Sequence, residues 1–340
     1  MIDRREMLLG VAGVAASGAV LAACQKPEEQ EEAVPPTQPL NESVPINPPD
    51  AEAIIADRFK GKTIIITGCA RGMGAGAARR AAREGANVVG IDWITDLGTK
   101  TIADIVAAGG KATFVDGDVG APETCARMVR VAVDTYGGVD LAINNAGVMD
   151  GVFSGEPIDY QKQKPLIFAP IHEATDEYWD RVFRTNSTGV FNSMRAELRQ
   201  MVAQGRGGAI VNVASIAGMT GLAGNPAYVA SKHAVNGLTR NAAIDYAPYG
   251  IRVNSVNMAA TDTPMVERAG ILVAEAAKSN LSTEPNMGRA KTFSLLAYAD
   301  PQHRPATVAE QVSMMLFLLS PEASNFTGGV FPTDGGWTGY

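Results

Sequence analysis

The chain has few cysteines and few histidines, and this scarcity excludes several kinds of chemistry. Its 340 residues contain three cysteines, Cys24, Cys69 and Cys125, and three scattered histidines. So few cysteines exclude a disulfide-built scaffold, and no cysteine or histidine spacing matches a zinc site. We therefore expect no metal site, and a mechanism built on a histidine base has little to draw on.

The sequence also lacks an excess of positive charge and an apolar run of ordinary membrane-spanning length. The net charge is −7 at pH 7, so no basic face predicts binding to nucleic acid. The apolar run from Met7 to Ala23 is about 17 residues long, whereas a membrane-spanning helix needs about 20. A chain of this length can form a core without disulfide or metal staples.

The amino-terminal segment has the features of an export signal. Arg4 and Arg5 precede the apolar run, and "DRREMLL" resembles the twin-arginine signal with which bacteria export folded proteins. "LAAC", residues 21–24, resembles the lipobox of bacterial lipoproteins, in which the cysteine is lipidated and becomes the first residue of the mature protein. We predict a signal peptide over 1–23 and a lipid on Cys24. An uncleaved amino-terminal anchor is the alternative.

The next segment, 24–50, is rich in proline and glutamate and almost free of large apolar side chains. Such a composition cannot bury enough surface to fold, which predicts a disordered, extended tether. The folded domain is then expected to cover 51–340. Signal and tether together predict a protein exported by the twin-arginine machinery and held by lipid on the extracytoplasmic, periplasmic side of the cell envelope.

From residue 51 onward, short β-branched runs alternate with segments of helical spacing. The predicted strands are 61–68, 87–92, 111–119, 139–147, 207–215, 251–257 and 328–336, and the predicted helices are 72–86, 98–110, 122–138, 176–204, 226–246 and 307–320. Such alternation favours parallel strands joined by right-handed crossovers. The pattern predicts a single-domain α/β fold of the Rossmann type, a doubly wound parallel sheet of about seven strands with helices on both faces.

A glycine-rich turn follows the first predicted strand. "TGCARGMG" contains Gly68, Gly72 and Gly74 and leads into the first predicted helix. Glycines in this position let the chain turn sharply and let a pyrophosphate approach the amino terminus of the helix. The order of strand, loop and helix predicts a dinucleotide site. A tight turn that binds no ligand is the alternative.

Asp92 ends the second predicted strand, about twenty residues further along. A carboxylate there accepts hydrogen bonds from the ribose hydroxyls of NAD and repels the 2′-phosphate of NADP. Arg71 in the glycine loop argues for the other cofactor, because a cation attracts phosphate. We expect NAD as the preferred cofactor, with NADP as the alternative.

Four motifs occur in order: "TGCARGMG" at 67–74, "NNAG" at 144–147, "NVAS" ending at Ser215, and "YVASK" from Tyr228 to Lys232. In this order they resemble the short-chain dehydrogenase/reductase family, over about residues 61–337. The resemblance implies reversible hydride transfer between the nicotinamide of NAD(P) and a carbinol or carbonyl carbon of a small molecule. It also implies a homodimer or homotetramer.

Tyr228 and Lys232 are four residues apart on a predicted helix and therefore share one face. A free tyrosine, with a pKa of about 10, is a poor base at neutral pH, and a neighbouring ammonium group lowers that pKa. Tyr228 is thus the candidate general acid/base, with Lys232 as its partner. The resemblance adds Ser215, which orients the substrate oxygen, and Asn186, which completes a proton relay through water and the lysine.

The resemblance also implies contacts with the cofactor. Thr263 matches a threonine that contacts the carboxamide of the nicotinamide, and Asp118 and Val119 match the pair that contacts adenine. The full set of expected cofactor contacts is Thr67, Gly68, Arg71, Gly72, Met73, Gly74, Asp92, Asp118, Val119, Asn145, Ala146, Gly147, Tyr228, Lys232 and Thr263.

The sequence departs from the family's pattern in two places. Met258 and Ala259 stand where the family has a Pro-Gly pair after the sixth strand. The segment 148–178 is longer than the family's, and 264–305 corresponds to its substrate-binding loop. Two long loops at one mouth favour a bulky apolar alcohol or ketone, with contacts between subunits as the alternative.

Two other functions stay open at this point. An exported nucleotide-binding protein of the same fold without turnover is the main alternative, because of the unusual turn after the sixth strand. A sugar-nucleotide epimerase or dehydratase would have the glycine spacing TGxxGxxG in place of the TGxxxGxG found here.

Overall fold

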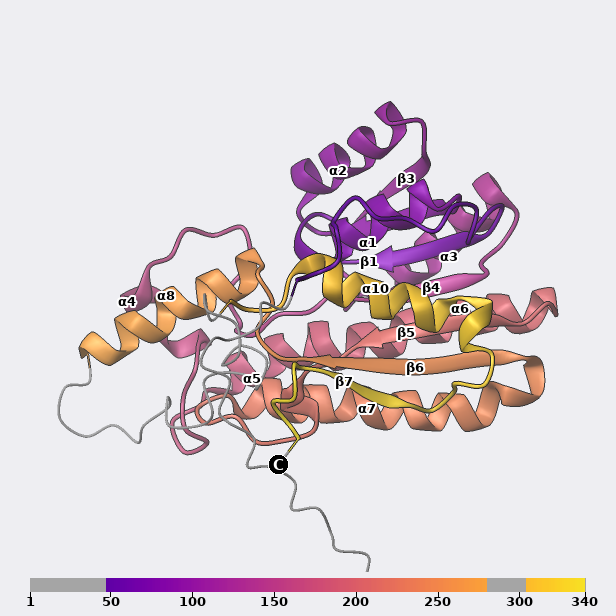
Figure 1. Cartoon of the computed structure of the whole chain (residues 1–340). Coiled ribbons are helices and arrows are strands. Elements are labelled where there is room, and N and C mark those ends of the chain that lie inside the picture. Colours follow the sequence, from indigo (N-terminus) through magenta and orange to yellow (C-terminus); the bar gives the residue numbers. More distant parts are fainter. Residues whose placement is uncertain (1–46, 280–303, 340) are drawn as a thin grey trace, which may run out of the picture. The chain divides into compact units, whose positions relative to one another are not determined.

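The computed structural model describes residues 47–279 and 304–339 (Figure 1). The predicted signal peptide 1–23, Cys24, most of the predicted tether and the second part of the 264–305 segment lie outside the described residues. The predicted boundaries at 23 and 50 therefore stay predictions. Within the described ranges, no helix is long and apolar enough to cross a membrane.

Seven strands form one sheet in the order β3-β2-β1-β4-β5-β6-β7, and every neighbouring pair is parallel. The strands form at the β-branched runs: β1 Thr63–Thr67, β2 Asn87–Asp92, β3 Lys111–Asp116, β4 Leu141–Asn144, β5 Gly208–Val213, β6 Ile251–Met258 and β7 Val330–Thr333. The predicted fold class is confirmed. The strand order reverses between β1 and β4, which is where doubly wound sheets bind ligands, at the carboxyl ends of the strands.

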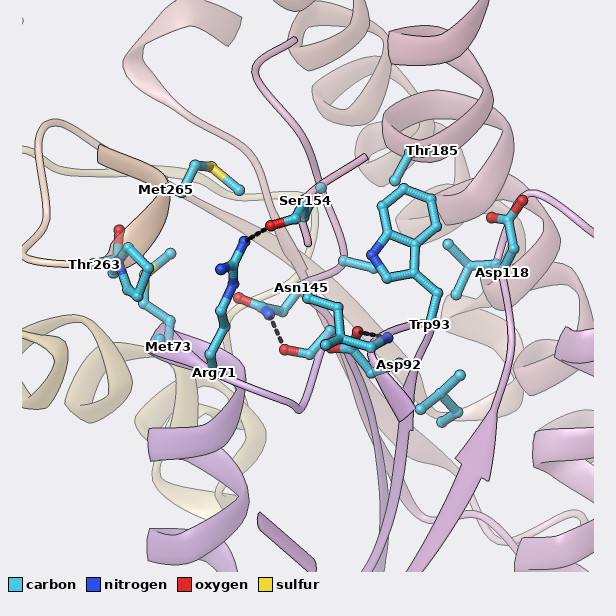
Figure 2. A pocket seen from close by; sticks show the side chains of 18 of the residues that line it. Arg71, Met73, Asp92, Trp93, Asp118, Asn145, Ser154, Thr185, Thr263 and Met265 are labelled. Carbon is cyan, nitrogen blue, oxygen red and sulfur yellow. Dashed lines mark hydrogen bonds between the residues drawn. The ribbon is translucent and has the colours of Figure 1, made fainter. Parts of the chain in front are cut away.

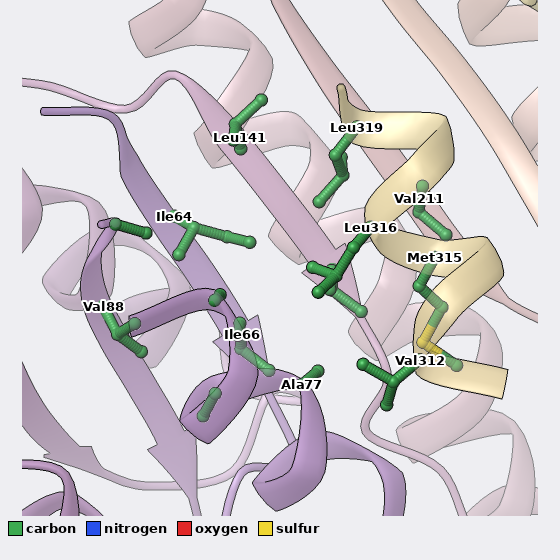
Figure 3. Close-up of a cluster of buried hydrophobic side chains, with 14 of the residues drawn as sticks. Ile64, Ile66, Ala77, Val88, Leu141, Val211, Val312, Met315, Leu316 and Leu319 are labelled. Atoms are coloured by element: carbon green, nitrogen blue, oxygen red, sulfur yellow. The ribbon is translucent and has the colours of Figure 1, made fainter. Parts of the chain in front are cut away.

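Helices cover both faces of the sheet. α1 Gly72–Arg83, α2 Thr95–Ala107 and α10 Val308–Leu319 pack on one face, and α3 Pro122–Tyr136, α6 Gly189–Gln204 and α7 Pro226–Tyr246 pack on the other. Figure 3 shows the first core, where Ile64 and Ile66 of β1 meet Leu316 of α10. Ile65, whose side chain points to the opposite face of the strand, belongs to the second core.

The predicted helix 176–204 is interrupted. α5 Asp176–Phe183 and α6 are joined by a π-helical turn, Arg184–Thr188. Asn186 lies in this turn, and its side chain makes two hydrogen bonds to the backbone of Val148. π-helical turns inside α-helices are frequent at functional sites, and periodicity alone does not reveal one.

Both segments expected to be long loops contain helices. α4 Tyr160–Gln163 lies within 148–178, and α8 Pro264–Ser279 occupies the start of 264–305. The interpretation of 264–279 as a loop is therefore wrong. The hydroxyl of Thr263 accepts a hydrogen bond from the backbone N–H of Val266 at 3.4 Å, and proline suits the first position of a helix.

Candidate functional site

An open pocket lies at the carboxyl ends of β1 to β4 (Figure 2), the edge at which doubly wound sheets bind their ligands. Eleven of the fifteen expected cofactor contacts line it, whereas Thr67, Gly74, Tyr228 and Lys232 do not. The lining set is Gly68, Arg71, Gly72, Met73, Asp92, Asp118, Val119, Asn145, Ala146, Gly147 and Thr263.

The glycine loop between β1 and α1 is folded so tightly that its backbone touches itself. Gly68 and Gly72 have left-handed backbone conformations, with φ of 71° and 56°. A Cβ atom on Gly74 would lie 2.0 Å from the carbonyl oxygen of Gly68. The loop therefore presents bare backbone to the pocket, as the close approach of a pyrophosphate requires. Gly74 contributes by packing against the loop, without lining the pocket itself.

Thr67 supports the pocket from beneath. Its side-chain oxygen accepts hydrogen bonds of 3.0 Å from the backbone N–H groups of Asn145 and Ala146. Asn145 returns two bonds of 3.1 Å from its side-chain amide to the carbonyls of Thr67 and Gly68. These bonds join the glycine loop to the end of β4. Thr67 thus supports the pocket from below, and its direct contact with a cofactor stays a prediction.

Asp92 is held at the end of β2 by backbone groups. Its two carboxylate oxygens accept hydrogen bonds of 2.9 Å from the N–H groups of Ala70 and Ile94. Burial raises the pKa of Asp92, and these N–H groups, together with the charge of Arg71, partly offset the rise. Each oxygen keeps a second lone pair, so the carboxylate can still accept from ribose hydroxyls. Arg71 donates to the carbonyl of Ser154 at 3.2 Å (Figure 2).

Tyr228 and Lys232 lie together on α7. The Lys232 Nζ atom is 5.6 Å from the centre of the Tyr228 ring and donates to the carbonyl of Val213 at 2.9 Å. Burial lowers the pKa of Lys232 to about 8. Burial also raises the pKa of Tyr228, and a hydrogen bond with Ser215 partly offsets that rise. The ammonium group of Lys232 keeps two further donors beside its bond to Val213, so the lowering of the Tyr228 pKa by Lys232 stays a prediction.

Ser215 follows β5 and is also bonded to its neighbours. Its hydroxyl accepts from the N–H of Ala217 at 3.2 Å and lies 3.5 Å from the carbonyl of Met258. Met258 stands at the position of the family's proline. The turn after it is held by backbone bonds to Ala306, since Ala306 donates to Ala260 at 3.1 Å and accepts from Asp262 at 2.8 Å. A second chain segment thus fixes this turn without a Pro-Gly pair.

Asn186 is fully buried between the end of β4 and α7. Its amide accepts from the N–H of Val148 at 2.8 Å and donates at 2.9 Å to the carbonyl of Val148 and to the hydroxyl of Ser231. A Cβ atom on Gly147 would lie 3.3 Å from the Asn186 side-chain oxygen and 3.4 Å from Lys232 Nζ. The structure therefore brings Gly147, Asn186 and Lys232 to one point beside the pocket.

Sequence reasoning missed several lining residues. Most lie within two residues of expected ones, namely Ile91, Trp93, Ile94, Gly117, Pro264 and Met265. Ser154 and Thr185 come from elsewhere: Ser154 from the long 148–178 segment and Thr185 from the π-helical turn. No local signal marks these two, because only the fold brings their segments over the pocket.

The 148–178 segment and α8 pack on each other at the mouth of the site. Val152, Tyr160, Ile167 and Leu272 form a small apolar core of their own. Arg268 of α8 donates to the carbonyl of Glu156 at 3.3 Å, and the same guanidinium lies 3.6 Å from the buried carboxylate of Asp150. On the cofactor side, the ring of Phe153 lies 5.2 Å from that of Trp93. The two segments expected at the mouth thus form one structural unit.

Comparison with known proteins gives consistent results. The family model described as short chain dehydrogenase matches residues 62–271. The 3beta-hydroxysteroid dehydrogenase of Mediterraneibacter gnavus is 36% identical over 84% of this chain and 98% of its own length. The cyclohexanol dehydrogenase of an Acinetobacter species is 37% identical over 84% and 99%. The crystal structure of a short chain dehydrogenase from Mycobacterium paratuberculosis bound to NAD superposes with a TM-score of 0.71 at 28% identity, over 83% and 100% of the two chains.

Proposed function

We propose that this chain, which belongs to the short-chain dehydrogenase family, uses NAD to oxidise a secondary alcohol on a carbocyclic ring. We also propose that it does so on the outer side of the membrane. The chain is an NAD(P)-dependent oxidoreductase that acts on CH–OH groups. The observation that carries the proposed hydride transfer is that Tyr228 lies beside Lys232 and Ser215, and that Lys232 and Asn186 both lie beside Gly147 of the pocket.

The residues of the pocket suit a dinucleotide. The glycine loop has no side chains in the way, so a pyrophosphate could approach its backbone closely. The carboxylate of Asp92 keeps lone pairs that can accept hydrogen bonds from a ribose. When bound, NAD supplies the acceptor for the hydride that leaves the carbinol carbon. Ser215 would hold the substrate oxygen, and Tyr228 would take the hydroxyl proton as general base, or return it as general acid in the reverse direction. Lys232 and Asn186 would hold the backbone next to Tyr228 in place through their hydrogen bonds to Val213 and Val148.

The proposed substrate class rests on two supports. The relatives named above act, by their names, on a hydroxysteroid and on cyclohexanol, both of which carry a hydroxyl on a saturated ring. Pro264 and Met265, at the start of α8, add apolar side chains to the lining of the pocket, which suits a hydrocarbon ring. A panel of cyclohexanol, a 3β-hydroxysteroid and a straight-chain primary alcohol tests this. We expect the highest kcat/KM with a ring alcohol, and a preference for the primary alcohol would contradict the assignment.

We expect Asp92→Ser to lower the preference for NAD over NADP by about 10- to 150-fold. The reason is that hydrogen bonds to a charged group contribute roughly 1.5–3 kcal/mol and each 1.4 kcal/mol is tenfold. The measurement is the ratio of kcat/KM for the two cofactors. The exposed Asp96, four residues further on, supplies the control: Asp96→Ser removes the same charge and should leave the ratio unchanged. A wild-type enzyme that already prefers NADP would show that Arg71, and not Asp92, sets the cofactor preference.

We also propose that the enzyme is a lipoprotein on the periplasmic face of the cell envelope. The support is the sequence alone: Arg4 and Arg5 before the apolar run, the "LAAC" at 21–24, and the Pro/Glu-rich 24–50 segment. Twin-arginine export carries folded proteins, so a nucleotide loaded in the cytoplasm would travel inside the domain.

Exposed apolar side chains on α5 to α7, among them Trp179, Phe191 and Ile244, support a homo-oligomer, which light scattering would test.

Replacing Cys24 with alanine should abolish labelling by a fatty-acid analogue and release the protein from alkaline-washed membranes. A lipid anchor attaches through that thiol alone, whereas an uncleaved apolar anchor would not need it. Cys125→Ala is the matched control, because this thiol is buried in the folded domain and its loss should leave the label in place. A Cys24→Ala protein that stays in the washed membranes would favour the uncleaved anchor.

A further inference from the structure

A buried polar network lies under the carboxyl end of β4, on the face covered by α6 and α7. Asn144, the last residue of β4, is in register with Asn212 of β5 and donates to its side-chain oxygen at 3.0 Å. Asn212 in turn donates to the hydroxyl of Thr239 on α7 at 2.9 Å. The amide nitrogen of Asn144 also donates to Oε2 of Glu197 on α6 at 3.1 Å. All four side chains are shielded from solvent, so their polar atoms must find hydrogen-bond partners inside the protein.

Two oxygens of this network have no hydrogen-bond partner: Oε1 of Glu197 and Oδ1 of Asn144. Each belongs to a group whose other polar atom already takes part in the 3.1 Å hydrogen bond between Asn144 and Glu197. If Glu197 is ionised, both atoms are buried acceptors without a donor, which is costly. A proton on Oε1 removes both deficits at once, because the new O–H can donate to Asn144 Oδ1.

We propose that Glu197 is held as the neutral acid and forms a two-point hydrogen-bonded pair with Asn144, which fixes the carboxyl end of β4 beneath the cofactor pocket. Asn145, Ala146 and Gly147 continue the chain directly from Asn144 and line that pocket. Glu197 touches none of the reacting groups. Its role is that of a positioning residue, which acts through Asn144 on the three residues that follow it.

The surroundings of Glu197 agree with a neutral acid. Burial raises the pKa of Glu197 to about 8, and the amide of Asn144 only partly offsets the rise. Over the described part of the chain, Glu197 makes no ion pair with any cation. The titratable group that faces it from α3 is the thiol of Cys125, whose pKa is itself raised to about 11 by burial. The polar groups that the sheet and α7 add to the network are the neutral side chains of Asn144, Asn212 and Thr239.

The proton has a consequence for pH dependence. The native carboxyl keeps a proton that the unfolded chain loses above its ordinary pKa of 4.5. The pair's contribution to stability is therefore complete below that pH, falls as the pH rises toward about 8, and stays constant beyond it. In the same upper range, loss of the proton should loosen the end of β4 and weaken nucleotide binding.

Three substitutions in the full-length chain separate the possibilities. Glu197→Gln keeps both hydrogen bonds, since its amide can donate to Asn144 Oδ1 and accept from Asn144 Nδ2, but it cannot titrate. Glu197→Leu removes the pair. Glu123→Gln makes the same chemical change at an exposed position and serves as the control. We expect the unfolding temperature of the wild type and of the control to fall between about pH 4.5 and pH 8, and their NADH affinity to fall as the pH passes about 8. Both quantities should depend less on pH in Glu197→Gln.

Infrared difference spectra give a readout that does not depend on nucleotide binding. At neutral pH, wild type minus Glu197→Gln should show the C=O stretch of a protonated carboxyl group, and wild type minus Glu123→Gln should show carboxylate bands. Carboxylate bands in the first spectrum would overturn the proposal, as would a pH dependence of Glu197→Gln equal to that of the wild type. A failure of NADH to bind at all would instead count against the proposed function, and the infrared result would still decide the state of Glu197.

Discussion

Replacing Tyr228 with phenylalanine is expected to lower kcat by about 10²–10⁴-fold, the usual contribution of a positioned general acid or base. The substitution removes one hydroxyl and keeps the ring that packs in the buried cluster with Val148, Ala217 and Ala227. Because Tyr228 does not line the dinucleotide pocket, the affinity for NADH should change little. Stopped-flow turnover and a fluorescence titration with NADH measure the two quantities separately.

Tyr178 provides a matched control for this substitution. It belongs to the same apolar cluster, is fully buried and does not line the pocket. Tyr178→Phe removes the same atom from the same surroundings and should retain most of kcat. Undiminished turnover in Tyr228→Phe, or an equal loss in both variants, would mean that the phenol of Tyr228 does not transfer the proton.

The second large effect is expected at Gly74. In Gly74→Ala the new Cβ atom would lie 2.0 Å from the carbonyl oxygen of Gly68 and 2.6 Å from the side-chain nitrogen of Asn145. The first contact is with backbone, which cannot rotate away, so the loop must open. We expect the free energy of unfolding to fall by about 1–3 kcal/mol, as for other overpacked sites, and NADH binding to be lost at concentrations that saturate the wild type.

Gly237 in the middle of α7 is the control for the glycine prediction. A Cβ atom there would meet nothing within 4 Å, and an alanine inside a helix is more favourable than glycine by roughly 0.5–1 kcal/mol. Gly237→Ala should therefore unfold at the same or a higher temperature and bind NADH normally. If Gly74→Ala binds NADH as tightly as Gly237→Ala, the close packing of the glycine loop is not what shapes the pocket.

The strands and most helices were predictable because each carries its own local signal. Buried parallel strands are short β-branched runs. At the start of α10, Thr307 and Glu310 have the spacing of a capping box, which they form in the structure. The catalytic candidates were equally visible, since Tyr228 and Lys232 are one helical turn apart. In such cases the signal and the structure both lie within a few residues of the chain.

The features that were missed depend on contacts between distant segments. The π-helical turn around Asn186 coincides with bonds to Val148, 38 residues earlier in the chain. Ser154 reaches the pocket through a segment with no regular spacing, and Arg71 contacts it across 83 positions. The role of Glu197 depends on meeting Asn144, 53 positions away. An isolated glutamate in a helix looks like an ordinary solvated charge, so only its burial reveals that it differs.

Thr67 shows what a family resemblance leaves open. The motif marks this threonine as a cofactor contact, and the structure adds that its hydroxyl oxygen accepts from the N–H groups of Asn145 and Ala146. In the same way, one donor of the Lys232 ammonium group bonds to the carbonyl of Val213. A motif fixes which residues gather around a site, whereas the hydrogen bonds that each one makes are set by the surrounding chain.

The proposed dehydrogenase and a nucleotide-binding protein without turnover share the same pocket and differ only in hydride transfer. The most direct test is to incubate the full-length protein with NAD and cyclohexanol carrying deuterium on its carbinol carbon, and to analyse the nucleotide by mass spectrometry. Our account predicts cyclohexanone together with reduced cofactor that carries one deuterium on the nicotinamide ring, and a strongly reduced yield with Tyr228→Phe. Tight binding of NADH with no labelled cofactor from cyclohexanol or from any ring alcohol of the panel would contradict it.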